Sequence, residues 1–314
     1  MLMKANNDKI KKLIQQKLTS TIRALNLESA YINFWNKGNN ISTLREKILQ
    51  FPRFNPLVIN IRTNNQRFKY FTIPEVDDLY DYSRRNFYGW EDIARQIYYE
   101  WCSESRTVVD VGAYSGVYTI LAIINGGPVN IICFEPNPRM LPILERNIYL
   151  NVNGLGKVTV NSFALSSVDG QLYFSENEHT SASQILSATS FNNDSTLNEN
   201  VIKVRVAKLD SLDLTEKIDL MKVDIEGHEI DFLHGSSITL SKDHPIILME
   251  ALDSLEYSKQ KELLKKFGYS HVIAVRERNG IIKNYVWIGR EHEYFISKIS
   301  HIIEKFSLTV DKIK

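Results

Sequence analysis

The sequence has few cysteines, no long apolar run and almost no net charge. Its 314 residues include two cysteines, Cys102 and Cys133, too few and too far apart for a zinc knuckle or a disulfide framework. Its 38 basic residues nearly balance 37 acidic ones, so the basic excess of a nucleic-acid-binding domain is missing. The chain contains neither an apolar stretch of roughly 18 residues nor the apolar segment of a signal peptide. We therefore expect a reduced, cytoplasmic protein with no nucleic-acid or membrane partner.

An apolar strand that runs into a glycine turn is the feature around which the chain is organised. The strand, residues 106–111, contains Asp110 and is followed by Gly112, Gly116 and an apolar helix-like segment, 117–124. A second apolar run, 129–134, comes one helix length later and ends in Glu135, nineteen residues after Gly116. This succession predicts a βαβ unit.

The order of residues in the turn differs from the dinucleotide-binding pattern. A pyrophosphate is bound by bare backbone N–H groups in a G-x-G-x-x-G turn, whereas here Asp110 precedes the first glycine and Tyr114 replaces the second. A carboxylate there repels phosphate and attracts an amine or a sulfonium, and Glu135 stands where an acid can bind the two hydroxyls of a ribose. These features point to S-adenosylmethionine. The alternative is an ordinary Rossmann turn in which Asp110 only caps a helix.

A second group of polar residues follows another apolar strand, 217–223. Asp224, Glu226 and His228 surround a glycine where this strand ends and a helix begins. Because ligands of parallel α/β sheets bind outside the carboxyl ends of the strands, we predict that these three residues are catalytic. Histidine can take a proton from a hydroxyl nucleophile. Asp224 and Glu226 could instead be a structural cap and a hydrogen-bond anchor.

Three further acids near this strand have less specific interpretations. Glu229 and Asp231 lie in the first turn of the expected helix, where they would complement the helix dipole. Glu250 ends a fifth strand and could form an oxygen-rich metal site with Asp224 and Glu226. The predicted site contains no metal.

The rest of the pattern predicts an α/β domain with an extension at each end. Residues 1–100 hold an amphipathic helix at 4–27, a short helix at 42–50 and a β-hairpin at 57–73, interpreted as a cap or a homo-oligomerisation arm. Residues 101–290 form the cofactor-binding domain, closed by the hairpin 269–288. Residues 291–314 form a C-terminal helix with a fraying tail. The polar segment 175–200 predicts a substrate lid, with plain disorder as the alternative.

Five blocks, in this order along the chain, resemble the FkbM family of S-adenosylmethionine-dependent methyltransferases. The blocks are residues 108–116, 134–138, 164–166, 209–212 and 222–229, and the resemblance covers about residues 70–290. The glycine turn departs from the family's usual pattern, because Tyr114 stands where asparagine is common. The resemblance implies an α/β, Rossmann-like class I methyltransferase fold, a sheet of seven strands with helices on both faces. It also implies O-methylation of a small molecule or a glycan.

The residues and the resemblance together define the predicted site. The cofactor-binding residues are Asp110, Gly112, Tyr114, Ser115, Gly116, Glu135, Pro136, Asn137, Ala164 and Asp224. His228, or Glu226 with Asp224, would serve as the base or hold the acceptor hydroxyl. A sugar hydroxyl is the favoured acceptor, by family analogy. The alternatives are a nucleic-acid methyltransferase, a nucleotide-binding oxidoreductase that would bind NAD, and a non-enzymatic scaffold.

Overall fold

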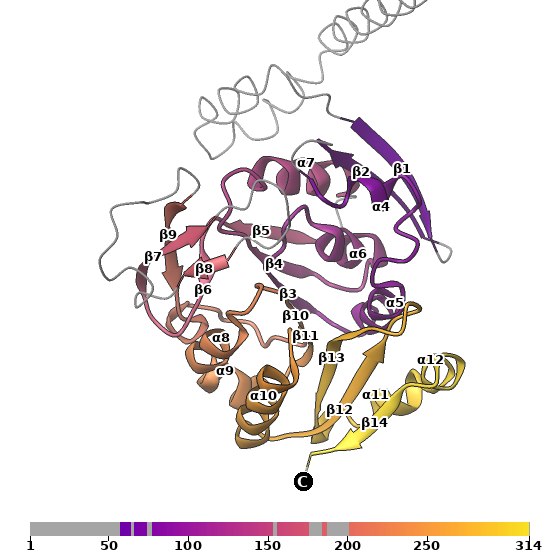
Figure 1. The fold of residues 1–314 in the computed structure, drawn as a ribbon, viewed down its shortest axis with the longest axis vertical. Helices are drawn as coiled ribbons and strands as arrows, with labels where there is room; N and C mark the ends of the chain where they lie inside the picture. Colours follow the sequence, from indigo (N-terminus) through magenta and orange to yellow (C-terminus); the bar gives the residue numbers. More distant parts are fainter. Residues whose placement is uncertain are drawn as a thin grey trace, which may run out of the picture. The chain divides into compact units, whose positions relative to one another are not determined.

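The computed structural model describes residues 57–63, 66–73, 77–152, 156–175, 184–186 and 201–313 (Figure 1). The helices expected at 4–27 and 42–50, and most of the expected lid, lie outside these residues. The chain divides into two compact units, Met1–Arg53 and Phe54–Lys314, and all described residues belong to the second. This unit begins ahead of the domain boundary predicted at residue 100. The role of the N-terminal region as a cap or an oligomerisation arm stays a prediction.

An eight-stranded sheet forms the centre of this unit, in the order β14-β12-β13-β11-β10-β3-β4-β5. The strands are β3 (Thr107–Val111), β4 (Asn130–Phe134), β5 (Lys157–Asn161), β10 (Leu220–Val223), β11 (Ile246–Glu250), β12 (Tyr269–Arg276), β13 (Ile282–Gly289) and β14 (Thr309–Lys312). The five strands from β11 to β5 are parallel, and the other three pair antiparallel. Every residue of β3, β10 and β11 is buried, as expected for parallel strands covered on both faces.

The order of the parallel strands reverses between β3 and β10. From β3 the chain adds β4 and β5 on one side, then crosses over to add β10 and β11 on the other. The predicted Rossmann-like α/β sheet is therefore confirmed, with one difference in strand count. The tail that was expected to fray forms β14 instead, because residues 309–312 pair with the edge of β12.

Helices cover both faces of the sheet (Figure 1). On one face lie α5 (Asp92–Cys102), α6 (Val117–Asn125), α7 (Leu141–Asn151), α11 (Tyr294–Lys298) and α12 (Ser300–Phe306), and on the other α8 (Glu229–Gly235), α9 (Ser237–Asp243) and α10 (Ser254–Lys266). Val108 belongs to the first hydrophobic core and Val109 to the second, because successive side chains of a strand point to opposite faces. Among the described residues, no helix has the length and apolar character needed to cross a bilayer.

The observed elements differ from the predicted ones in the C-terminal region and in the segment 175–200. The single helix expected after residue 290 consists of the 3-10 turn η3 (Arg290–His292) and the two short helices α11 and α12, which meet at Ile299. A four-stranded sheet of order β6-β9-β7-β8 joins β6 (Ala164–Leu165), β7 (Gly170–Ser175), β8 (Gln184–Leu186) and β9 (Val201–Ala207); the 3-10 turn η2 (Leu209–Ser211) follows it. Part of the segment predicted as a lid is thus the strand β8, paired with β7.

The expected hairpin is formed by β1 (Leu57–Thr63) and β2 (Gln66–Thr72), and the short helix α4 (Tyr80–Ser83) follows. Two asparagines of α7, one turn apart, bind the free edge of β2. Asn147 accepts a hydrogen bond from the N–H of Phe71 (2.5 Å) and donates to its carbonyl (3.0 Å). Asn151 does the same with the N–H (2.9 Å) and the carbonyl (2.7 Å) of Lys69. The two side chains continue the sheet ladder, so the hairpin is fixed to α7.

We predict that Asn147→Ala lowers the free energy of unfolding by about 3 kcal/mol, because it leaves part-buried backbone groups of Phe71 and the buried Ser115 carbonyl without their partner. Asn151→Ala is the matched control, and it should cost about 1 kcal/mol or less because water can reach its partners. Chemical denaturation of both variants measures the difference. Equal costs would contradict this account of the hairpin.

Candidate active site

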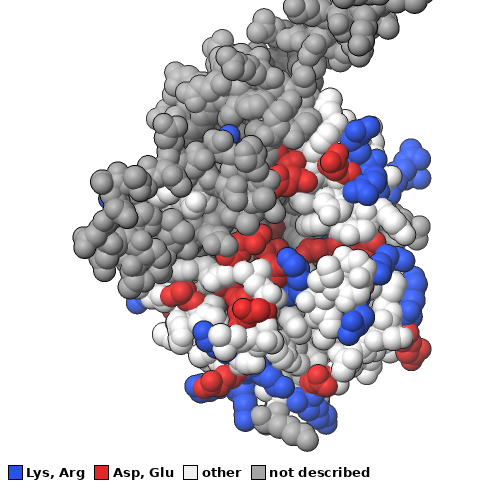
Figure 2. Space-filling model, in the orientation of Figure 1, with Lys and Arg blue, Asp and Glu red and all other residues white. Residues whose placement is uncertain are grey.

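A cavity of about 310 Å³ lies at the carboxyl ends of β3, β4, β10 and β11, where the strand order reverses. Figure 2 shows acidic side chains gathered around the hollow in the middle of this face. Open α/β sheets bind their ligands at this point. The predicted site residues that line the cavity are Asp110, Gly112, Tyr114, Ser115, Glu135, Pro136, Asn137, Ala164, Asp224 and Glu226. Gly116 and His228 do not line it.

Two glycines shape the turn after β3. Gly112 has a φ of +78°, and a Cβ atom there would lie 1.9 Å from the carbonyl oxygen of Asp224. The residue is therefore glycine because the turn touches the backbone at the end of β10. At Gly116, where α6 begins, a Cβ atom would lie 2.6 Å from Leu144 on α7. Both glycines allow close packing of neighbouring elements, and Gly112 also lines the cavity.

Glu135 fastens the glycine turn to the end of β4. One of its carboxylate oxygens accepts a hydrogen bond from the N–H of Tyr114 and the other from the N–H of Asn137, both at 2.7 Å. Burial raises the pKa of Glu135 to about 7, although these two bonds oppose the shift. Each oxygen retains a lone pair for a further donor. The arrangement holds a carboxyl group at the cavity wall with its orientation fixed.

Asp110 is bound to the helix that follows it. It is almost fully buried, and the hydroxyl of Thr119 on α6 donates to its carboxylate at 2.6 Å. Burial raises the pKa of Asp110 to about 6. The side chain thus joins β3 to α6 and also lines the cavity, and its part in binding a cofactor stays a prediction.

A buried polar network connects the glycine turn to the hairpin. The Tyr70 hydroxyl lies 2.7 Å from both the Asp77 carboxylate and the Ser115 hydroxyl. Asp77 also accepts from Thr72 at 2.7 Å, and burial raises the pKa of Asp77 to about 6. This network was not predicted, because its members are spread over forty-five residues of the chain. A signal was the alternation along β2, which places Tyr70 and Thr72 on its buried face.

Three carboxyl groups meet at the ends of β10 and β11. One oxygen from each of Asp224, Glu226 and Glu250 lies within 4.8 Å of the others, a geometry that a cation could use. Two of these acids already have an ammonium partner, however. Lys222 donates to Asp224 at 3.0 Å, and the Lys283 nitrogen lies 3.2 Å from Glu250. Any role of a metal here stays a hypothesis.

The buried charges of this cluster fix one another's protonation. Burial alone would lower the pKa of Lys222, but the carboxylates of Asp224, Glu91 and Glu250 outweigh it and raise that pKa. Burial likewise would raise the pKa of Asp224, but Lys222 outweighs it and the pKa is lowered. Burial, and then the charge of Asp224, raise the pKa of Glu250 to about 8. At neutral pH Lys222 and Asp224 are therefore charged, and the charge of Asp224 favours the protonated form of Glu250.

The loop after β10 presents Glu226 from a left-handed backbone conformation, with a φ of +53°. Glu229 holds this loop, because its two carboxylate oxygens accept hydrogen bonds from the N–H groups of Ile225 and Gly227, both at 2.9 Å. Glu229, expected only to complement the helix dipole, thus positions its neighbour. Burial, and then the charge of Asp224, raise the pKa of Glu226.

His228 lies outside this arrangement. Its Nε2 atom is 2.8 Å from the Ser166 hydroxyl, and its Nδ1 atom is 3.6 Å from the carboxylate of Asp231. The ring is buried, which lowers its pKa. The structure therefore brings Asp224 and Glu226 together at the cavity but does not bring His228 to them. A role for His228 as the base has no support from this geometry.

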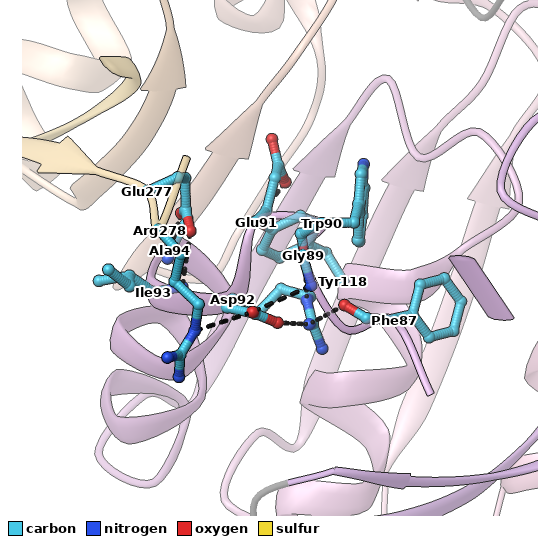
Figure 3. A network of polar contacts seen from close by, with 11 residues as sticks. Phe87, Gly89, Trp90, Glu91, Asp92, Ile93, Ala94, Tyr118, Glu277 and Arg278 are labelled. Carbon is cyan, nitrogen blue, oxygen red and sulfur yellow. Dashed lines mark hydrogen bonds and ion pairs between the residues drawn. The ribbon is translucent and has the colours of Figure 1, made fainter. Parts of the chain in front are cut away.

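The wall opposite the glycine turn was not predicted. Glu91, just before α5, accepts from the hydroxyl of Tyr118 and the amide of Asn284, both at 2.7 Å. Glu277, from the loop between β12 and β13, accepts from the N–H groups of Ile93 and Ala94 and so caps α5 (Figure 3). Glu277 is far from the glycine turn in the sequence, and no local motif marks Glu91 or Glu277.

A family comparison decides the class of this protein. The model of the Methyltransferase FkbM domain matches residues 110–280, more than half of the chain. The chain belongs to the FkbM methyltransferase family. The predicted family and the predicted enzyme class, a methyltransferase, are therefore confirmed, and the oxidoreductase alternative is left without support.

A curated protein is also similar in sequence. The hexuronic acid methyltransferase AglP of Haloferax volcanii is 27% identical over 179 residues, which cover 57% of this chain and 68% of that protein.

Two solved structures are similar to this chain at lower sequence identity. An FkbM methyltransferase from Methylobacillus flagellatus aligns with 15% identity and a TM-score of 0.45, covering 68% of this chain. The chain spans 56% of the length of that protein. The TYW2 protein of M. jannaschii, solved in complex with AdoMet, aligns with 13% identity and a TM-score of 0.41. The alignment covers 74% of this FkbM-family chain and 86% of the TYW2 chain.

We predict that Glu250 makes the protein less stable as the pH rises from about 4.5 to about 8. Its pKa is higher in the folded state than its ordinary value of 4.5. Its contribution to stability is therefore fully present below that value and is lost as the pH rises through about 8. Urea unfolding at several pH values should show a flatter profile for Glu250→Gln, by up to about 1.4 kcal/mol per pH unit. If the stability of the unmodified protein and of Glu250→Gln changed with pH in the same way, Glu250 would be ionised in the folded protein and the prediction would be wrong.

Proposed function

We propose that this protein transfers a methyl group from S-adenosylmethionine to a hydroxyl group of a sugar or glycan. The observation that carries the proposal is the acid-lined cavity at the point where the strand order reverses. A cavity of this charge suits a ligand with a sulfonium and an amine, and it disfavours a pyrophosphate. Among the described lining residues the cations are Lys222 and Lys283, and both already face carboxylates.

The cofactor would occupy the part of the cavity formed by β3, β4 and β6. Glu135 has free lone pairs for the hydroxyls of a ribose, since each oxygen binds one backbone N–H. Ala164 and Phe174 supply apolar surface suited to an adenine ring. Tyr114, in place of the family's usual asparagine, accepts a hydrogen bond from Asp78 through its hydroxyl (3.2 Å). When bound, S-adenosylmethionine supplies a methyl carbon made electrophilic by the adjacent sulfonium.

The acceptor would occupy the part lined by Asp224, Glu226 and the wall around Glu91. We assign the base to Glu226, because a carboxylate with a raised pKa takes a proton more readily than one with a lowered pKa. Asp224, held ionised by Lys222, would accept a hydrogen bond from the acceptor and orient it. The acceptor oxygen forms the new bond to the methyl carbon, and its proton passes to Glu226. Most of the barrier reduction in such a displacement comes from positioning.

Two observations support a sugar as the acceptor. The related AglP protein is named as a hexuronic acid methyltransferase, although its identity of 27% leaves the acceptor of this chain open. The acceptor part of the cavity is also lined by Tyr82, Trp90 and Tyr118 together with the amides of Asn279 and Asn284. Aromatic rings beside polar groups suit a sugar ring, which has apolar C–H faces and a rim of hydroxyls.

We predict that S-adenosylhomocysteine, the demethylated product, binds at least about tenfold more tightly than NAD. Calorimetric titration of each ligand into the purified protein measures this. Glu135→Gln should weaken the binding of S-adenosylhomocysteine, because one amide oxygen cannot replace the fixed carboxylate. The melting temperature of the variant shows whether the turn is intact. Preferential binding of NAD by the unmodified protein would refute the proposed cofactor.

We predict that Glu226→Gln lowers kcat by about 100-fold or more while the affinity for S-adenosylhomocysteine stays within about twofold. The variant removes the proton acceptor and leaves the cofactor part of the cavity unchanged. Glu262→Gln, the same chemical change on an exposed residue of α10 that pairs with Lys266, is the control. Initial rates of methyl transfer measure the effect. A larger loss in His228→Ala, with cofactor affinity unchanged, would return the base to His228.

A further inference from the structure

We infer that the acceptor of this enzyme is a sugar without an acidic group, either neutral or amino-bearing, and that sugar acids are rejected. This inference rests on the proposed function and narrows its acceptor class. It comes from the balance of charge around the acceptor part of the cavity, where five carboxyl groups and two ammonium groups line the space. These residues are Glu91, Asp224, Glu226, Glu250, Glu277, Lys222 and Lys283.

Both lysines are committed to acids of the protein. Lys222 is 1% exposed and its ammonium group contacts Asp224 at 3.0 Å and Asn284 at 3.4 Å. Lys283 is more exposed, but its pKa is raised chiefly by Glu250, with further contributions from Glu226 and Asp224. It therefore sits in the field of three carboxyl groups. Within the described residues, no arginine lines the cavity.

A carboxylate on the acceptor would therefore enter a space of its own sign. It would approach Glu226, and the Glu277 carboxylate, already used to cap α5, adds negative charge to the same wall. Placing like charges together in a partly buried site is strongly unfavourable. To form an ion pair, the acceptor would have to take Lys283 from Glu250. A fixed donor fork such as an arginine, which binds carboxylates in two parallel hydrogen bonds, is missing from the described lining.

The same groups suit hydroxyl and amino donors. Carboxylates accept hydrogen bonds and have no donor when ionised, so they bind groups that carry O–H or N–H. A neutral sugar matches this set of partners, and an amino sugar adds a favourable charge. The expected acceptor thus differs from the hexuronic acid in the name of the Haloferax relative.

The test compares matched acceptors. Methyl glycosides of glucose, galactose and mannose are offered with S-adenosylmethionine, each as the neutral sugar, the amino sugar and the uronic acid. We expect the best kcat/KM among the neutral or amino sugars, at least about tenfold above that of any uronic acid. A best rate on a uronic acid overturns the inference, and so does the absence of transfer to all nine. Binding of S-adenosylhomocysteine is measured in parallel, and its absence would instead overturn the proposed function.

A variant at the cavity rim tests the same point by gain of function. Ile281 lines the cavity and the residue is 51% exposed, so a longer side chain should not disturb the fold. Ile281→Arg should raise the ratio of uronic-acid to neutral-sugar kcat/KM several-fold, because it supplies an unpaired cation. Ile281→Gln is the uncharged control and should leave the ratio unchanged. An equal ratio in both variants would contradict charge as the basis of selection.

Discussion

The buried ammonium group of Lys222 is the interaction on which the arrangement of the site depends. A charge with 1% exposure is tolerable only where opposite charges and hydrogen bonds surround it. Asp224 supplies the charge, and Asn284 connects the lysine to Glu91 on the opposite wall. Strands β10 and β13 and the start of α5 are thereby joined through one chain of polar contacts. The same lysine keeps Asp224 ionised, which in turn favours the protonated form of Glu250.

The part of the site that could be predicted from the sequence is local in the chain. Asp110, Gly112 and Glu135 belong to one βαβ unit, whose spacing fixes where each residue stands at the edge of the sheet. Glu277 comes from a loop far away in sequence, and Glu91 stands outside the βαβ unit with no motif around it, so only the fold shows that both line the cavity. Closeness in the chain can also mislead. His228 stands only two residues after Glu226, but the chain has turned away from the cavity by that position.

The parts of the fold that could be predicted are likewise those with a local pattern in the sequence. Continuous apolar runs identify the parallel strands, since they are buried on both faces. The pairing of residues 309–312 with β12 was missed, because a short strand at a sheet edge has no strong pattern of its own. The link from Asn147 to the hairpin was missed as well, since an asparagine in a helix gives no sign of its distant backbone partner. Together with Tyr70 and Ser115, that link makes the glycine turn depend on the hairpin.

The cap that Glu277 provides for α5 has a consequence for the order in which the molecule is assembled. The carboxylate and the two N–H groups that it binds are separated by 184 and 183 residues. A chain made from its N-terminus presents α5 long before the loop between β12 and β13 exists. The first turn of the helix therefore lacks this partner until synthesis has passed Glu277, well into the last third of the chain. The cavity wall becomes complete only then, so a partly synthesised chain does not present a finished site.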